Sequence, residues 1–216
     1  MLANSATTGY SYAGVGTALG SDWRSHSQTI CLWARYGTVS ASRHLVHQVL
    51  NVSPFSGWRL RHGGGGKVVA TWVDGAGASQ VEIESTAEYD DGVWRHFAAR
   101  HTAGGAPQWY VDGVAVAQTV WANAPTGVLV PATTVEIGRL GSAFFVGDLA
   151  DVRVYTRALT ANEIATIHAA RGRDGIVSGL GFRAPLGVNG ADVGPSGYAA
   201  TPIGSPTHGA GVLRIP

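Results

Sequence analysis

Two glutamates in the middle of the sequence have the residue type and spacing for carbohydrate chemistry. Glu82 and Glu84 are two apart in a segment, 79–86, that alternates like a β-strand, so both carboxylates should share a face. Retaining glycoside hydrolases use two carboxylates about 5–5.5 Å apart as nucleophile and acid–base. The next carboxylate, Glu88, does not fit the E-x-D-x-x-E spacing of laminarinase-type enzymes. We therefore expect two solvent-facing strand residues, with glycoside hydrolysis the weakest of the functional hypotheses.

Patterns for metal and nucleotide sites are weaker still. His44 and His47 are three apart in a strand-like segment, which predicts that they lie on opposite faces, and no His-Glu-x-x-His motif accompanies them. The run Gly63–Gly66 followed by Lys67 lacks the Ser or Thr of a phosphate loop and leads into a strand instead of a helix. It is better interpreted as a flexible hairpin tip.

Charge and composition exclude several partners. The 15 basic and 14 acidic residues leave a net charge of +1 without a Lys/Arg block, which argues against nucleic acid. No stretch approaches the roughly 18–20 apolar residues of a membrane helix, so we expect no membrane insertion. The N-terminus lacks a secretory signal pattern, which predicts synthesis in a cytoplasm. The single cysteine, Cys31, sits in an apolar run and should be a buried hydrophobic residue.

The elements that would position these residues are mostly β-strands. Alternation of apolar and polar residues, broken by turn signals every 8–12 residues, predicts an all-β fold: a two-sheet antiparallel β-sandwich or jelly roll. The Asp112-Gly113 step between two apolar runs predicts a tight hairpin. The expected strands are 8–14, 28–36, 43–51, 57–62, 67–74, 79–86, 93–101, 107–111, 114–119, 133–138 and 145–155.

One segment, near 160–170, predicts a short helix. Thr160 and Glu163 have the spacing of a capping box, and Gly172 follows the expected end. The Gly/Pro-rich stretch 172–216 alternates apolar clusters with turns, so we expect two or three further strands that close the sandwich. No linker divides the sequence, which indicates a single domain over residues 1–216.

Four motifs, in the expected order, resemble the laminin G-like, concanavalin A-type jelly-roll family. They are Asp91–Ala98 (DGVWRHFA), Tyr110–Gly113 (YVDG), Val135–Gly138 (VEIG) and Phe145–Ile164 (FVGDLADVRVYTRALTANEI). A fifth stretch, 191–207, looks like the ribbon that opens such domains but comes last here, so the order of the edge strands can be permuted.

The resemblance implies roles for individual residues. Trp94 would fill the sandwich interior, and His96 would be a core histidine. Val152 and Val154 would face the core, while Asp151 and Arg153 would pair on the other face.

Cofactors are left almost open by the sequence. Relatives of this kind often hold one calcium ion at a rim. A structural calcium ion is therefore the one cofactor that we consider, with candidate ligands next to turns at Asp74, Asp90, Asp91 and Asp148.

Two non-catalytic functions follow as hypotheses. The first is a structural module on a virion surface, a capsid decoration or tail protein of a tailed phage. It would be homo-oligomeric, bound to other protein subunits of the particle, and able to contact host glycans; the low charge, the absence of disulfides and the long C-terminal ribbon motivate it. The alternative is a free lectin or adhesin domain, whose sugar-stacking residues would be Trp121 and Trp72.

Overall fold

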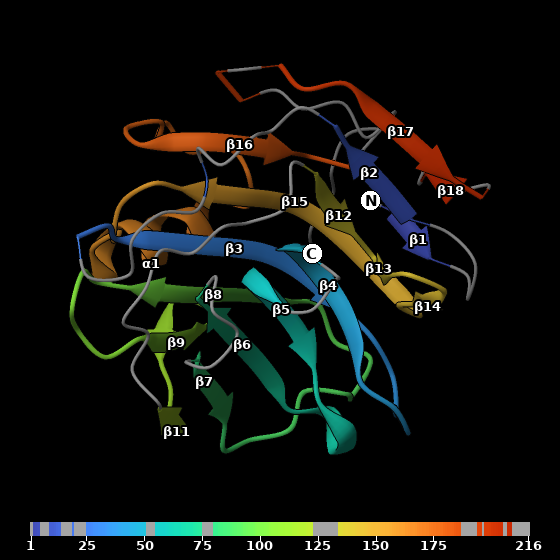
Figure 1. Cartoon of the computed structure of the whole chain (residues 1–216), viewed down its shortest axis with the longest axis horizontal. Helices are drawn as coiled ribbons and strands as arrows, with labels where there is room; N and C mark the ends of the chain where they lie inside the picture. Colours follow the sequence, from blue (N-terminus) through green and yellow to red (C-terminus); the bar gives the residue numbers. More distant parts are fainter. Residues whose placement is uncertain are drawn as a thin grey trace.

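The chain folds into two large antiparallel sheets packed face to face, with one helix on the outside of the first sheet (Figure 1). This confirms the predicted jelly-roll β-sandwich. The computed structural model describes residues 2–4, 9–13, 19, 25–50, 55–74, 80–122, 134–186, 194–195, 197–204 and 207–208.

The first sheet has the strand order β10-β9-β8-β3-β15-β1-β18, and β16 also pairs with β15. Its long central strands pair over most of their length, from Gln28↔His101 to Ala34↔Arg95 between β3 and β8. The strands are β1 (Leu2–Asn4), β3 (Gln28–Arg35), β8 (Arg95–His101), β9 (Gln108–Val111), β10 (Val114–Ala115), β15 (Gly147–Tyr155), β16 (Leu180–Ala184) and β18 (Thr207–His208).

The second sheet has the order β11-β7-β6-β5-β4-β12-β2-β17. A separate hairpin, β13 (Arg139–Leu140) with β14 (Ala143–Phe144), follows β12. The strands are β2 (Gly9–Tyr12), β4 (Arg43–Leu50), β5 (Ser56–His62), β6 (Val68–Val73), β7 (Gln80–Ser85), β11 (Gln118–Ala122), β12 (Val135–Ile137) and β17 (Ala200–Ile203).

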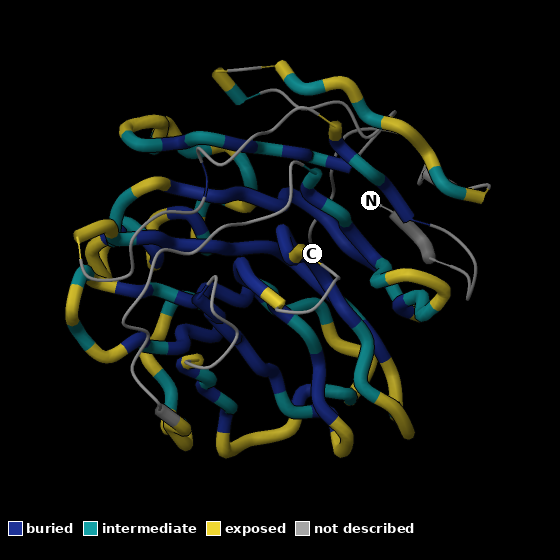
Figure 2. Tube along the Cα trace, in the orientation of Figure 1, coloured by how far each residue is buried: buried dark blue, intermediate teal, exposed yellow. Residues whose placement is uncertain are grey.

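The core lies between the sheets, as the dark tube of the central strands shows in Figure 2. Three fully buried tryptophans contribute to it: Trp58, Trp72 and Trp109. Each indole N–H donates a hydrogen bond, respectively to Gln48 Oε1 (3.2 Å), Gln28 Oε1 (2.8 Å) and the Ile83 carbonyl (3.1 Å). Because these polar atoms are satisfied, the large rings can be buried without leaving an unpaired donor.

Two turns show how local sequence sets the hairpins. Asp112 and Gly113 both have positive φ, 51° and 82°, and join β9 to β10 as predicted. The glycine run also joins two paired strands, β5 and β6, through the 3₁₀ turn η2 (Gly64–Gly66). This turn is not the loose tip that we expected. Gly66 is buried, and its carbonyl accepts hydrogen bonds from the Tyr36 hydroxyl (3.1 Å) and the Tyr89 N–H (3.0 Å).

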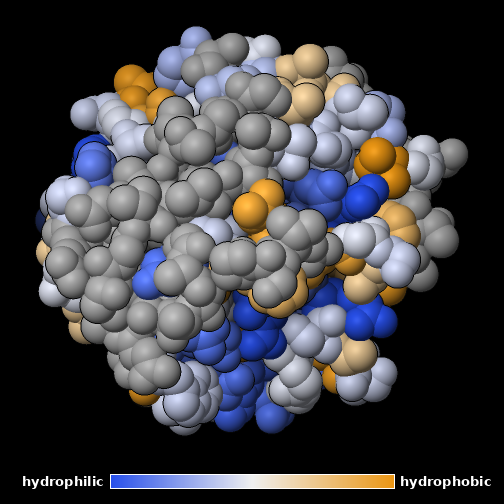
Figure 3. Space-filling model, in the orientation of Figure 1, coloured by the Kyte–Doolittle hydropathy of each residue, from blue (hydrophilic) through white to orange (hydrophobic). Residues whose placement is uncertain are grey.

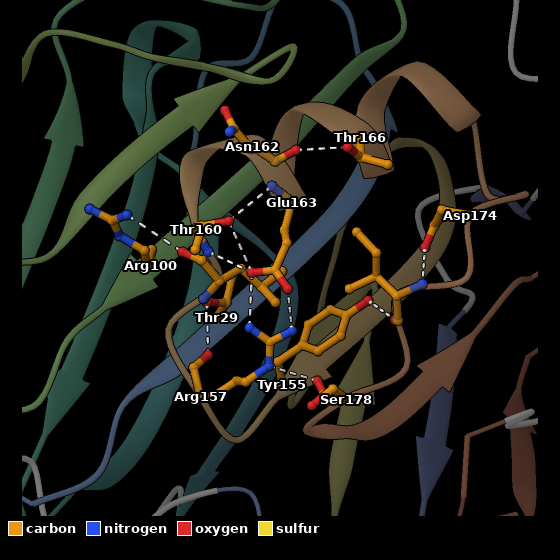
Figure 4. A network of polar contacts seen from close by, with 12 residues as sticks. Thr29, Arg100, Tyr155, Arg157, Thr160, Asn162, Glu163, Thr166, Asp174 and Ser178 are labelled. Carbon is orange, nitrogen blue, oxygen red and sulfur yellow. Dashed lines mark hydrogen bonds and ion pairs between the residues drawn. The ribbon is translucent and has the colours of Figure 1, made fainter.

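The helix α1 (Ala161–Ala170) begins at the predicted capping box. The Glu163 N–H donates to Thr160 Oγ1 (3.2 Å), and the Thr160 N–H donates back to the Glu163 carboxylate (2.8 Å) (Figure 4). The Arg157 guanidinium donates two hydrogen bonds, of 2.9 and 2.6 Å, to the same carboxylate. At the other end Arg171, with φ 49°, takes the left-handed position one residue before Gly172.

A second small core forms where α1 covers the outer face of the first sheet. Ile164 and Ile167 of the helix pack there with Cys31, Ala98 and Tyr155. Cys31 is buried as predicted, and burial raises the pKa of its thiol to about 12. His96 is also buried, and this burial lowers its pKa to about 3. Trp94, however, precedes β8 and packs against Trp33 on this outer face, so it does not fill the interior as expected. The alternation that begins at Phe97 places Phe97 and Ala99 inside instead.

Asp151 and Arg153 pair on this outer side of β15, as predicted, but both are buried. Arg153 Nε donates to Asp151 (2.9 Å), and its two terminal nitrogens each donate to Asp174 (2.8 Å). Arg183 on β16 closes the network with a 2.8 Å bond to Asp151. These contacts fix the segment after α1 against the sheet.

The C-terminal ribbon adds strands to both sheets, as expected. β16 pairs with β15, whereas β17 pairs with β2 and β18 pairs with β1. The last strands of the chain therefore lie beside the first ones at the sheet edges, while the permutation itself stays a prediction.

No described helix has the length and apolar character needed to span a membrane. On the face drawn in Figure 3, the visible hydrophobic residues form separate small patches.

We predict that Glu163→Gln destabilises the fold at neutral pH and has little effect in acid. The Arg157 hydrogen bonds lower the pKa of Glu163 from 4.5 to about 2. Because the folded-state pKa is the lower one, the contribution of Glu163 is complete above pH 4.5 and disappears as the pH falls toward 2. Urea unfolding should show a loss of about 0.5–1 kcal/mol at pH 7. The difference from wild type should shrink on acidification. Glu88→Gln, at an exposed position, is the control, and a deficit that is the same at pH 7 and pH 2.5 would contradict this account.

Candidate ligand-binding face

The outer face of the second sheet carries a continuous line of polar side chains. Residues directly opposite each other on neighbouring strands share a face. The registers therefore define a central row with one residue from each strand: Trp121, Glu82, Thr71, Arg59, His47, Glu136, Ser11 and Thr201. At about 4.8 Å a strand the row is about 34 Å long. The row is not uniformly open, because Trp121 is 48% exposed whereas Thr71 and His47 are buried.

Glu82 lies near one end of the row, and both of its carboxylate oxygens accept hydrogen bonds. Its carboxylate accepts from Thr71 Oγ1 (2.8 Å) and from the Arg61 guanidinium (3.1 Å). Glu84 lies on the same face, as predicted, and pairs with Lys67 (3.4 Å). Each glutamate is thus held by a cation.

His44 and His47 lie on the same face, which corrects the prediction from their spacing. The pairing of β4 with β5 shifts between His44 and Val46, so Leu45 is an extra, bulged residue. The two rings meet edge to face with centroids 5.5 Å apart. Burial, helped by the neighbouring His47 and Arg59, lowers the pKa of His44 to about 3, so this ring is neutral at physiological pH.

Glu136 collects two cationic partners farther along the row. His47 Nε2 and Arg139 Nε both approach its carboxylate to 3.3 Å. Burial opposes ionisation of Glu136, but the pKa is lowered overall because the nearby His47 and Arg139 stabilise the charged form. A hollow of about 240 Å³ opens at this point and is lined in part by His47, Glu136, Arg139 and Thr134.

Arg59, between Thr71 and His47 in the row, has no such partner. Its Nε is buried without a hydrogen bond, and its side chain makes no ion pair within the described residues. Burial lowers its pKa, and nearby Arg61 lowers it further. The nearest carboxylates in the row, Glu82 and Glu136, are already bound by Arg61 and Arg139.

The two tryptophans predicted to stack on sugars are in different environments. Trp121, on the edge strand β11, is 48% exposed and lies on the outer face opposite Glu82. Trp72 is 1% exposed, packs in the core and donates its N–H to Gln28. It offers no ring face to a ligand, which corrects the expectation for this residue.

The four aspartates considered for calcium do not gather into one ligand cluster within the described residues. Asp91 pairs with Arg95 (2.5 Å) and Asp148 with Arg35 (2.7 Å), while Asp74 is buried at the end of β6. Asp90 packs against Gly66. Over the described ranges no three His, Cys, Asp or Glu side chains gather as metal ligands would. The calcium ion stays a prediction.

Sequence analysis missed Arg59, Glu136 and Arg139 as possible site residues. The alternation in Ser56–His62 (SGWRLRH) was a usable signal, since Trp58 and Leu60 are apolar while Arg59 and Arg61 between them are charged. The position of Glu136 beside His47 depends on pairing between β12 and β4, which are far apart in the chain. No local pattern reports it.

Comparison with known proteins places the chain among lectin-like folds. A family model described as the concanavalin A-like lectin/glucanases superfamily matches residues 7–165. No curated protein matches.

Solved structures share the fold at low sequence identity. A proposed carbohydrate-binding protein from Bacteroides ovatus has TM-score 0.62 and 18% identity over 99% of this chain and 63% of that one. The binding domain of botulinum neurotoxin serotype G has TM-score 0.56 and 13% identity over 69% of this chain and 37% of that one. The serotype D ligand-binding domain, solved with N-acetylneuraminic acid, has TM-score 0.52 and 10% identity over 67% and 36%. The matched part is between about a third and two thirds of those chains.

The two tryptophans should differ sharply on truncation. Trp72→Ala removes a buried ring and leaves the buried Gln28 Oε1 without the indole N–H donor. We therefore expect a loss of about 3–5 kcal/mol in the free energy of unfolding. Trp121→Ala removes a half-exposed edge residue and should change stability by less than about 1 kcal/mol. Urea titration followed by circular dichroism measures both. Similar losses for the two variants would contradict the burial described here.

Proposed function

Because the chain belongs to the concanavalin A-like lectin/glucanase superfamily, we propose that it is a non-catalytic carbohydrate-binding module. The glycan would lie on the outer face of the second sheet, along the central row. Trp121 would be its stacking platform.

The observation that carries this proposal is the position of Trp121 at the end of a polar row. A sugar has apolar C–H faces that stack on an aromatic ring and hydroxyls that need hydrogen-bond partners. Trp121 is 48% exposed, and in register beyond it lie Glu82, Thr71 and Arg59. The aromatic surface of Trp121, next to the partly exposed carboxylate of Glu82 and guanidinium of Arg59, provides both kinds of contact, while the buried Thr71 hydroxyl orients Glu82.

The similar structures are consistent with a binding role, although their likeness is one of fold. The Bacteroides ovatus and botulinum neurotoxin proteins are described as binding proteins or binding domains, and none of the three is described as a hydrolase. Function depends on the residues placed on a fold, so these names support the proposal only together with the central row.

Catalysis of glycoside hydrolysis is disfavoured by the state of the two strand glutamates. A retaining hydrolase needs one carboxylate free to attack and another able to give up a proton. Glu82 is bound by Thr71 and Arg61, and Glu84 by Lys67. Both are therefore used in ion pairs across the strands.

The hypothesis of a virion surface protein has less support. It makes claims about the location of the protein, its oligomeric state and its protein partners. No comparison supports a capsid or tail role, whereas the sugar-binding part of that hypothesis agrees with the present proposal.

A glycan array followed by calorimetric titration of the best binder tests the proposal. We expect Trp121→Ala to weaken binding by about tenfold or more, since a stacked tryptophan is a typical binding hot spot. Trp121→Phe should retain much of the affinity. Val114→Ala, at an exposed residue of the first sheet, is the control.

The same preparation should release no reducing ends from laminarin. Release that disappears in Glu84→Gln would replace the binding proposal with a hydrolase. An array without any glycan above background would also refute it.

A further inference from the structure

The charges on the outer face of the second sheet do not balance. Near the centre of the row lie three guanidiniums, of Arg59, Arg61 and Arg139, and two carboxylates, of Glu82 and Glu136. Arg61 pairs with Glu82 and Arg139 with Glu136. His44 adds no charge because its ring is neutral. One positive charge, that of Arg59, is left over.

The environment of Arg59 disfavours an unpaired positive charge. The side chain is only partly exposed, its Nε is buried without a partner, and Arg61 lies close by on the same strand face. A cation that has lost part of its hydration destabilises the folded state unless a nearby anion offsets the loss. Glu82 is the one carboxylate that favours the charge of Arg59 among the described residues, and it already forms its ion pair with Arg61.

A hollow lies one strand away from this side chain. Arg59 is directly opposite His47, and His47 lines the hollow of about 240 Å³ beside Glu136 and Arg139. A guanidinium presents a planar set of N–H donors that suits the two oxygens of a carboxylate or sulfate group. We infer that Arg59 binds the acidic group of the ligand, so that the face accepts acidic saccharides in preference to neutral ones.

This inference rests on the proposed function and adds its substrate class. In the row, Arg59 is three strands from Trp121, about 14 Å away. A ligand that stacks on Trp121 and reaches Arg59 must therefore be an oligosaccharide, with its acidic unit over β5 and a further unit over β11. Free acidic monosaccharides would contact only one of the two anchors and bind more weakly.

Titration with matched ligands tests the acidic preference. The probes are an oligogalacturonate, its neutral carboxyl-reduced counterpart and a sulfated galactan fragment of the same length. We expect the acidic ligands to bind on the order of 10- to 100-fold more tightly than the neutral one, because a hydrogen-bonded charge pair contributes that much. The ratio between the carboxylate and sulfate probes identifies which acid the site takes.

Arg59→Gln is the decisive variant. It should abolish the preference by lowering the affinity for the acidic ligands to that for the neutral oligosaccharide, whereas Trp121→Ala should weaken the binding of both classes. Arg173→Gln, the same charge change at an exposed residue of the segment after α1, is the matched control. Arg59→Gln should also melt no lower than wild type, since it removes an unpaired charge; a lower melting temperature would indicate a structural role instead.

The two proposals fail in different ways. Equal binding of acidic and neutral ligands, or a preference that survives Arg59→Gln, would overturn the acidic-ligand inference and leave the binding module standing. Absence of binding by all probes and by a full array would refute both.

Discussion

The buried guanidinium of Arg153 determines which outer face of the sandwich is covered by the chain's own residues. Arg153 on β15 is 1% exposed, and a buried guanidinium is tolerated only when carboxylates surround it. Asp151 comes from the same strand and Asp174 from the segment after α1, so pairing the charge draws that segment onto the first sheet. Arg183 and Tyr155 join the network, with the Tyr155 hydroxyl donating to the Ile176 carbonyl (2.9 Å). The outer face of the first sheet is thereby partly occupied by its own chain, whereas the second sheet keeps exposed or partly exposed side chains such as Trp121, Glu82 and Arg59 on its outer face.

Local sequence was enough to predict most of the fold. Alternation located nearly every strand, the Asp-Gly pair located its hairpin, and the Thr160–Glu163 spacing located the start of α1. The three-residue strand β1 escaped because so short a segment carries no alternation, and its pairing with β15 is entirely non-local. Trp94 was assigned to the interior because the resemblance supplied a motif without stating where the strand begins.

The candidate site was far less predictable, for two physical reasons. In Val68–Val73 almost every residue is apolar, so alternation could not show that Trp72 is inside while Thr71 is outside. The bulge at Leu45 reversed the expected relation of His44 to His47, and a bulge has no reliable local signature. The unpaired state of Arg59 depends on what Arg61 and Arg139 do on the same face, which only the strand registers reveal.

The central row also restricts where insertions and deletions in the sequence can be tolerated. Because every member of the row is set by strand register, insertion of a single residue within β6 would exchange Thr71 for Trp72 at that point. A large ring would then stand on the ligand face and a hydroxyl group in the core. Insertions in the turns leave the row intact, so length variation among homologues should be confined to the turns. The strands themselves can evolve only by substitution.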